Sequence, residues 1–237
     1  MFVAFPFTWT MGHPPLDILL EDNHLLVIAK PVALPTMGVA DDRPTALTLA
    51  KEYIRKKYHK PGNVYLGIVS RLDAPTSGAL LIARTSKAAK RLTEQFREGR
   101  VTKQYWALVE GDPPEKPTEL TDWVRKDERH RRMHIANRSS PGAQQARLVY
   151  RRIAEVRDSS LVEVELLTGR KHQIRVQLSN QDYPILGDRK YGATEPFPSG
   201  IALHSRRLVF EHPVRREPVE VIAPLPASWR KFGVREP

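Results

Sequence analysis

Short apolar segments separated by brief polar turns constrain the fold of this chain more than any other feature. Helical patterns do not alternate regularly with them. Strands joined by short turns pair antiparallel, whereas a doubly wound parallel sheet needs a helix between successive strands. We therefore expect an α+β fold with a mixed, mainly antiparallel sheet flanked by helices and loops. The predicted strands lie in ILLEDNHLLVIAKP (18–31), VYLGIVS (64–70), GALLIAR (78–84), VTKQYWALV (101–109) and LVEVELL (161–167).

Three segments carry helical patterns. The first follows a capping residue, Thr45, and ends before Pro61-Gly62. The second is capped by Ser86 and ends at Gly99, with basic residues opposite its apolar face. The third, RKHQIRVQLSNQ (170–181), has apolar residues four apart, and we predict a helix with a basic first turn.

No internal repeat or low-complexity linker divides the chain, so residues 15–226 are interpreted as one domain. Residues 1–14 are then an N-terminal extension and residues 227–237 a C-terminal tail. Within the domain, residues 111–146 are polar, proline-containing and aperiodic. This composition predicts a long excursion over the surface, of the kind that is usually functional or disordered.

The chain is strongly basic, with 38 Lys and Arg against 27 Asp and Glu and a formal net charge of +11. Two stretches concentrate this charge: residues 84–104 hold seven Lys or Arg against two Glu, and residues 125–138 hold six against one Asp and one Glu. Such stripes suit a phosphate backbone, and they favour a polyanion such as a nucleic acid as the partner. A merely basic, soluble surface is the alternative.

Several chemistries are excluded or unsupported. The absence of cysteine excludes disulfides, thiolate catalysis and zinc sites that use sulfur. No apolar run approaches the roughly 18 residues of a membrane helix, and the first ten residues lack the features of a signal peptide. We expect a cytoplasmic protein with no membrane association.

Metal and cofactor sites find no support in the motifs. His130 and His134 are four apart, as zinc ligands on a helix often are, but the arginines between them argue against a bound cation. No phosphate-binding glycine motif or serine nucleophile elbow is present. Gly169, Arg170 and Lys171 could bind one anion at a helix start, or they could form a turn with solvated charges. We therefore predict no metal and no cofactor.

One carboxylate remains as a candidate reagent. Asp73 lies in SRLDAPTSG (70–78), between two apolar segments and close to Arg71. A single Asp can act as a nucleophile or as an acid or base when a neighbouring cation keeps it ionised. Because Arg71 and Asp73 are two apart, however, the pair on its own is more typical of an ordinary surface salt bridge than of a catalytic unit. Composition and spacing alone indicate a basic, nucleic-acid-binding domain with one conspicuous Asp.

The same stretch resembles a known signature. SRLDAPTSGALLIART is similar to the HRLDxxTSGxxxxA motif of the RluA family of RNA pseudouridine synthases. Four further blocks resemble the family's motifs in the family's order: DNHLLVIAKPVALP, VTKQYWALVEG, LLTGRKHQIRVQLSNQDYPILGDRKYG and ALHSRRLVFEHP. Together these blocks span residues 22–213.

The resemblance implies a reaction and the residues that perform it. A uridine in structured RNA, an rRNA or tRNA stem-loop, would be flipped out, cleaved at its glycosidic bond and rejoined through C5 without cofactor or metal. Asp73 would be essential, either attacking the sugar C1′ or removing a sugar proton. Arg175 would pair with Asp73, and Tyr105 would lie against the target base.

Further positions are carried over from the motifs as substrate-binding residues. Arg71 would occupy the space that the flipped base leaves, and Leu203 would help to wall the pocket. The remaining substrate-binding positions are Thr76, Lys103, Arg170, Lys171 and His172. The family also suggests a monomer.

The chain departs from the family pattern at several positions. Ser70 stands where the family has His, Ser205 where it has Ala, and Gln144 and Leu148 where it has Lys and Thr. The last two affect any inference about which RNA is modified. With the domain beginning at about residue 15, we also expect no small N-terminal RNA-binding S4 domain of the kind that many members carry. A non-catalytic RNA-binding or RNA-folding protein on the same scaffold is the alternative function.

Overall fold

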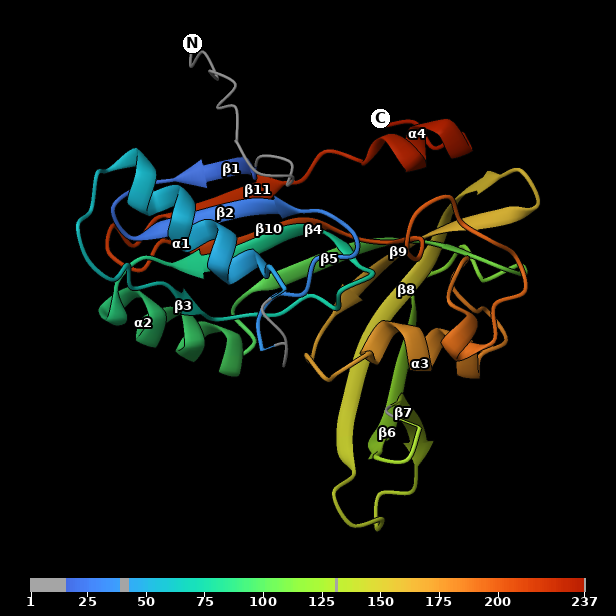
Figure 1. Cartoon of the computed structure of the whole chain (residues 1–237). Helices are drawn as coiled ribbons and strands as arrows, with labels where there is room; N and C mark the ends of the chain where they lie inside the picture. The colour runs from blue at the N-terminus through green and yellow to red at the C-terminus, as the bar shows by residue number, and fades with distance from the viewer. Residues whose placement is uncertain (1–15, 39–42, 131, 237) are drawn as a thin grey trace.

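The computed structural model describes residues 16–38, 43–130 and 132–236. Its strands form a single eleven-stranded sheet, with the order β1-β2-β4-β10-β5-β9-β8-β6-β7, β11 paired with β10, and β3 paired with β4 (Figure 1). Neighbouring strands pair antiparallel except for β4 and β10, which run parallel. The predicted α+β class with a mixed, mainly antiparallel sheet is confirmed. The extension predicted at residues 1–14 lies outside the described residues.

The elements have the following bounds. The strands are β1 (Asp17–Glu21), β2 (Leu25–Lys30), β3 (Gly67–Ile68), β4 (Ser77–Ala83), β5 (Thr102–Val109), β6 (Thr118–Asp127), β7 (Arg132–Ala136), β8 (Gln144–Val156), β9 (Ser159–Leu166), β10 (Leu203–Glu211) and β11 (Pro218–Ile222). The helices are α1 (Ala46–Lys57), α2 (Ser86–Arg97), α3 (Gln173–Asn180), α4 (Ala227–Phe232) and the 3₁₀ turn η1 (Arg189–Tyr191).

Helices α1 and α2 cover opposite faces of strands β2 and β4. Successive side chains of a strand point to opposite faces of a sheet. Thus Leu80 and Ile82 of β4 pack in the same cluster as residues of α1, whereas Leu81 packs with residues of α2. Because both faces are covered, every residue of β4 is buried. The end of β4 that carries the polar 71–76 segment is therefore a rigid support.

Strand β10 joins β4 to the rest of the sheet at a close backbone contact. Ser77 and Gly78 pair with His204 and Ser205 in the parallel register. Gly78 has φ +114°, and a Cβ there would lie 2.6 Å from Ser205 N and closer still to its carbonyl oxygen. Only glycine fits this approach. The contact fixes where the chain leaves the 71–76 segment.

The segment 111–146 differs from its prediction. It contains β6, β7 and the first residues of β8, which pair antiparallel and form a projecting end of the sheet (Figure 1). We call residues 118–147 the arm. Only Val124 and Met133 of β6 and β7 are buried, so the period of two is weak in the sequence. A small apolar cluster of Val124, Met133, Ala146, Val176 and Tyr191 attaches the arm to α3 and η1.

Two further element boundaries differ from the predictions, and one agrees with them. Only Gly67–Ile68 of the segment 64–70 is a strand, and it pairs with Ala83 and Ile82 of β4, while β10 pairs with Ser77 and Gly78 of that strand. The N-cap of α2 is Thr85, not Ser86, and its side chain accepts a hydrogen bond from the amide of Ala88. Thr45 caps α1 as predicted.

The third helix begins later than predicted. Helix α3 starts at Gln173, and Arg170 and Lys171 precede it. His172 at the N-cap has φ +51°, a left-handed conformation that no continuing helix adopts. The basic residues therefore form the loop that enters the helix and not its first turn.

The predicted C-terminal tail contributes to the core. Helix α4 lies at residues 227–232, and Trp229 and Val234 belong to the main apolar cluster. The packed part of the chain thus extends at least to Val234, beyond the boundary expected at residue 226.

Candidate active site

The residues on both sides of Asp73 are anchored to the segment that follows β2. The backbone N–H of Leu72 donates to Thr36 Oγ1 at 3.1 Å, and Thr36 Oγ1 donates to the Leu72 carbonyl at 2.8 Å. The Nζ of Lys30 donates to the Ala74 carbonyl at 3.2 Å. Asp73 itself accepts the amide of Thr76 through its backbone carbonyl. These bonds hold the backbone of the Asp73 turn, residues 71–76, on both sides of the carboxylate.

Arg175 of α3 joins Asp73 to a second carboxylate. Its Nη1 donates to Asp73 Oδ2 at 3.1 Å, while its Nε and Nη2 donate to the two oxygens of Asp188 at 2.6 and 2.8 Å. The side chains of Arg175 and Asp188 are 6% and 2% exposed, against 26% for Asp73. Bidentate pairing with Asp188 fixes the plane of the guanidinium, which in turn directs Nη1 at the exposed carboxylate. The predicted contact between Arg175 and Asp73 is present.

A histidine faces the same oxygen of Asp73. His172 Nε2 lies 3.7 Å from Oδ2, longer than a hydrogen bond. Burial lowers the pKa of His172 to about 4, with Asp73 opposing the shift and Arg175 adding to it. The imidazole is therefore neutral at pH 7. Both Arg175 and His172 approach Oδ2, and among the described residues no side chain bonds to Oδ1.

Tyr105 lies on β5, opposite Ser205 of β10, which in turn pairs with Gly78 next to the Asp73 turn. Its side chain is 8% exposed. Burial raises the pKa of Tyr105 to about 12, and the negative charge of Asp73 acts in the same direction. The phenol therefore stays protonated at neutral pH and can donate a hydrogen bond near the carboxylate.

The structure disposes the other predicted residues in two groups. Arg71 is exposed. Among the described residues, the arginine that forms an ion pair with Asp73 is Arg175 and not Arg71. Arg170 and Lys171 are also exposed, with Arg170 Nε donating to the Gln145 carbonyl. Thr76, Lys103 and Leu203 are buried. Within the described residues the hydroxyl of Thr76 has no hydrogen-bond partner, so a donor or acceptor of a ligand could satisfy it.

Three residues near Asp73 were not predicted. Asp188 and Tyr191 belong to the block that resembles PIxGDxxYG, and their place in that motif was the available signal. The guanidinium carbon of Arg175 lies 4.9 Å from the centre of the Tyr191 ring. Lys30 is 1% exposed, and burial lowers its pKa to about 7, opposed by the charge of Asp73. A lysine that ends an otherwise apolar strand was its signal.

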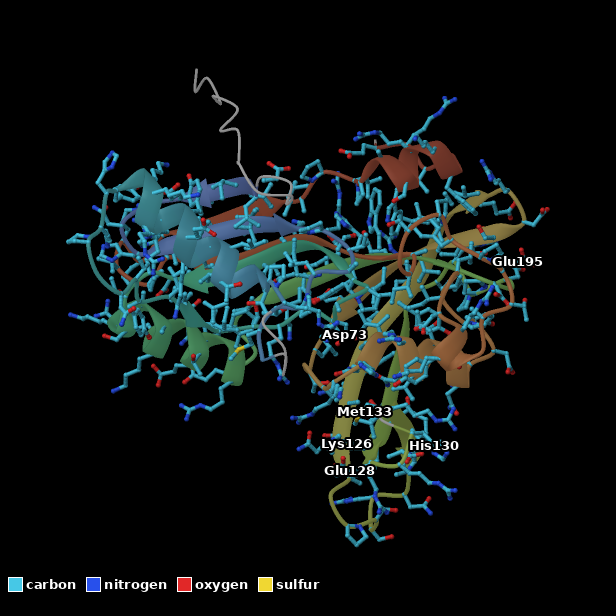
Figure 2. The ribbon with its side chains drawn as sticks, in the orientation of Figure 1. Asp73, Lys126, Glu128, His130, Met133 and Glu195 are labelled. Atoms are coloured by element: carbon cyan, nitrogen blue, oxygen red, sulfur yellow. The ribbon has the colours of Figure 1, made fainter. Side chains whose placement is uncertain are left out.

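His130 and His134, considered above as a zinc pair, lie in a hairpin instead of on one helical face. His130 Nδ1 lies 2.6 Å from Asp127 Oδ2 in the turn after β6, and His134 pairs with Arg125 across β6 and β7. Figure 2 shows His130 with Lys126 and Glu128 on the arm, away from Asp73, which lies where the arm meets the sheet.

Residues 24–180 match the family model described as RNA pseudouridylate synthase. The chain belongs to this family. The matched segment includes Asp73, Tyr105 and Arg175, while Asp188 and Tyr191 follow it. The family inferred from the motifs is thus confirmed.

Named relatives of this pseudouridylate synthase family cover most of the chain. It is 35% identical over 229 residues to "Ribosomal large subunit pseudouridine synthase D" of Xylella fastidiosa, covering 90% of this chain and 66% of that protein. It is 34% identical over 220 residues to "Uncharacterized RNA pseudouridine synthase YhcT" of Bacillus subtilis, covering 92% of this chain and 71% of that protein. The chain thus spans about two thirds of the length of these curated relatives.

A solved structure shows the same fold. "Human RNA Pseudouridylate Synthase Domain Containing 4" superposes with a TM-score of 0.76 at 27% identity, covering 93% of this chain and 94% of that one. Among the described residues, no helix is long and apolar enough to cross a membrane.

Proposed function

We propose that this chain isomerises uridine to pseudouridine in ribosomal RNA, with Asp73 as the essential residue. One observation carries the proposal: a partly exposed carboxylate is held through one oxygen by a buried arginine, itself fixed by Asp188. The other oxygen, Oδ1, is free to act on the ribose. The names of the relatives, ribosomal large subunit pseudouridine synthase D among them, support rRNA over tRNA as the substrate.

The site suits a base that has left its helix. A uracil stacked in a duplex is out of reach of Asp73, and extruding it costs a few kcal/mol, least in single-stranded loops. Exposed Arg71, two residues from Asp73, has a planar charged group that can occupy the vacated space and bind phosphate. Tyr105 presents an aromatic face and a hydroxyl to the base, and Leu203 excludes water behind it.

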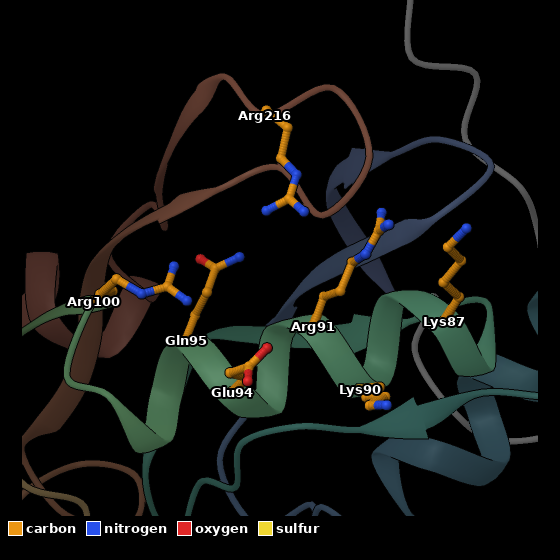
Figure 3. Close-up of a pocket in the computed structure, with 7 residues that line it drawn as sticks. All are labelled: Lys87, Lys90, Arg91, Glu94, Gln95, Arg100 and Arg216. Atoms are coloured by element: carbon orange, nitrogen blue, oxygen red, sulfur yellow. The ribbon is translucent and has the colours of Figure 1, made fainter.

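The RNA backbone would lie on two basic surfaces. One is the arm, where Arg125, Lys126 and Arg129 are exposed. The other is a hollow of about 320 Å³ between α2 and the turn that joins β10 to β11 (Figure 3). We call it the basic hollow; it is lined by Lys87, Lys90, Arg91, Glu94, Gln95, Arg100 and Arg216. Cationic side chains of this kind neutralise phosphates and release counterions.

The test is to incubate the protein with unmodified rRNA and tRNA transcripts and to map pseudouridine by carbodiimide adducts and reverse transcription. We expect new pseudouridine at discrete positions in rRNA with wild type and none with Asp73→Asn. Asp158→Asn, at an exposed Asp remote from the site, is the matched control and should be as active as wild type. Undiminished product with Asp73→Asn would contradict the assigned role.

A non-catalytic RNA-binding protein on this scaffold is the competing function, since the basic surfaces alone would suffice for it. That function predicts RNA binding without new pseudouridine in any transcript. The buried Arg175–Asp188 pair disfavours it, because burying two charges is costly and binding does not require a carboxylate held in a fixed orientation. Modification confined to tRNA would keep the reaction and correct the substrate.

A further inference from the structure

A chain of polar contacts joins the arm to Asp73. The backbone N–H of Met133, on β7, donates to Tyr191 Oη at 2.9 Å. Tyr191 Oη lies 2.7 Å from His172 Nδ1, and His172 Nε2 lies 3.7 Å from Asp73 Oδ2. Figure 2 shows Met133 on the arm below Asp73. Thus two side chains, Tyr191 of η1 and His172 at the start of α3, lie between the arm and the carboxylate of Asp73.

The backbone amide of Met133 fixes which group donates and which accepts in each hydrogen bond of this series. A backbone amide can only donate, so Tyr191 Oη must accept from Met133. The phenol proton of Tyr191 then goes to His172 Nδ1, which accepts it, and the imidazole carries its own proton on Nε2. In the opposite arrangement Tyr191 would accept twice and its proton would lack a partner, although the residue is only 7% exposed. The Nε2–H of His172 therefore points toward Asp73.

The surroundings keep His172 neutral and in place. Burial lowers its pKa most; Asp73 opposes the shift, while Arg175, Lys171 and Lys190 reinforce it. Its backbone, at φ +51°, is in a region that non-glycine residues rarely adopt. Strain of this kind persists only where contacts impose it, and here the bond to Tyr191 is one of them. The position of the ring is thus tied to the arm.

We infer that Tyr191 and the Met133 amide are positioning groups that hold His172 as a hydrogen-bond donor to Asp73, so that the arm acts on the carboxylate through His172. This inference rests on the proposed function for its catalytic consequence. The contact of 3.7 Å shortens to a hydrogen bond when RNA closes the site, as catalytic bonds commonly do. His172 then belongs with the groups that orient Oδ2 and leave Oδ1 free, and not with the substrate-binding residues.

Nuclear magnetic resonance of the ring nitrogens in the free protein tests the chain of bonds without any RNA. His172→Gln assigns the His172 signals by their loss. In wild type we expect a proton on Nε2 and none on Nδ1. Tyr191→Phe removes the hydroxyl but keeps the ring over Arg175, and the pKa of His172 should rise by about half to one pH unit, because a neutral hydrogen bond is worth about 1 kcal/mol.

Tyr183→Phe is the matched control, because Tyr183 is partly buried beside Tyr150 and lies outside the chain of bonds. It should leave the His172 titration unchanged. A proton on Nδ1 in wild type, or the same His172 pKa in Tyr191→Phe as in wild type, would overturn the inference.

Rates on the rRNA transcript test the catalytic consequence. His172→Gln keeps an N–H donor near Oδ2 and His172→Met does not, while both residues bear the same backbone strain. We expect kcat to fall about ten-fold in His172→Met with KM unchanged, and to fall several-fold less in His172→Gln. Equal losses in the two variants would refute a positioning role. If wild type forms no pseudouridine, the proposed function fails, while the ring-nitrogen titration still decides the chain of bonds.

Discussion

On one side of Asp73 lies the central sheet, which holds the turn by backbone pairing and apolar packing. On the other side lies the arm with α3 and η1, where buried charges and polar side chains make the connections. Gly78 against Ser205 represents the first kind of contact, and Arg175 between Asp73 and Asp188 represents the second. A packed backbone fixes the position of a residue. Charges and hydrogen bonds fix the orientation of its side chain, and their strength depends on the neighbouring groups. The sheet thus decides where Asp73 lies, and the arm decides how its oxygens are presented.

The largest effect is expected where the sheet side is broken. Gly78→Ala places a Cβ against the backbone of Ser205 at φ +114°, where neither strand can retreat without breaking the pairing on its other edge. Overpacking and backbone strain each cost about 1–3 kcal/mol, so we expect a loss of about 4 kcal/mol in the free energy of unfolding, measured in urea. Gly62→Ala is the control, because a Cβ there meets nothing within 4 Å. A loss under about 1 kcal/mol in Gly78→Ala would show that the contact can relax.

Breaking the arm side at its centre comes next. Asp188→Asn leaves Arg175 buried with Asp73 as its remaining carboxylate partner, and removal of one member of a buried pair costs about 3 kcal/mol or more. We expect that loss in urea unfolding, together with a fall in kcat, because the guanidinium no longer has a fixed plane. Glu94→Gln removes an exposed pair with Arg97 and should cost under about 0.5 kcal/mol. Full activity in Asp188→Asn would mean that Asp73 is oriented without it.

The sequence predicted the contacts that a motif carries and missed those that the tertiary fold creates. The pairing of Arg175 with Asp73, about a hundred residues apart, came from a family resemblance and is present at 3.1 Å. Asp188 lies in the same sequence block as Arg175, yet nothing local distinguishes a buried carboxylate from an exposed one. A periodic pattern of apolar residues indicates which face of a helix or strand is buried, and Asp188 lies in neither kind of element.

The arm escaped prediction for a related reason. Strands β6 and β7 each have one buried residue, Val124 and Met133, so neither strand shows a sustained alternation of apolar and polar residues. The parallel pairing of β4 with β10 was equally invisible, because it joins segments more than a hundred residues apart through His204 and Ser77. By contrast, α1 and its cap at Thr45 were predictable, since both depend on residues within one turn.

A smaller effect should appear as a pH dependence of stability on the sheet side. Burial lowers the pKa of His204 to about 4, and its Nδ1 lies 2.9 Å from Ser77 Oγ. Between pH 6.5 and 4 the unfolded chain binds a proton that native His204 does not, so the free energy of unfolding falls as pH decreases through that window. The contribution is at most about 3 kcal/mol, at about 1.4 kcal/mol per pH unit.

Urea unfolding between about pH 4 and pH 7 measures this dependence. In His204→Gln the part of the slope due to His204 should vanish, while the part due to His172 remains. His59→Gln, at an exposed histidine after α1, should keep the wild-type slope. An unchanged slope in His204→Gln would mean that another group on the sheet side titrates in this window.

The smallest effect is expected at the basic hollow, whose lining residues make none of the contacts described above for Asp73. Gln95 holds α2 to β10 by two bonds with the backbone of Glu211, and Lys87 and Lys90 line the hollow beside it. If the hollow only holds phosphates, Lys87→Gln with Lys90→Gln should raise KM a few-fold and leave kcat unchanged, because binding then weakens equally in the ground and transition states. The slope of log K against log salt should fall by about 1 for each phosphate that is no longer neutralised. Lys231→Gln, on α4 at an exposed site, should change neither quantity. A fall in kcat in the double variant would instead mean that contact of RNA with α2 affects Asp73, as we infer for the arm. The distinction between the sheet side and the arm side would then no longer hold.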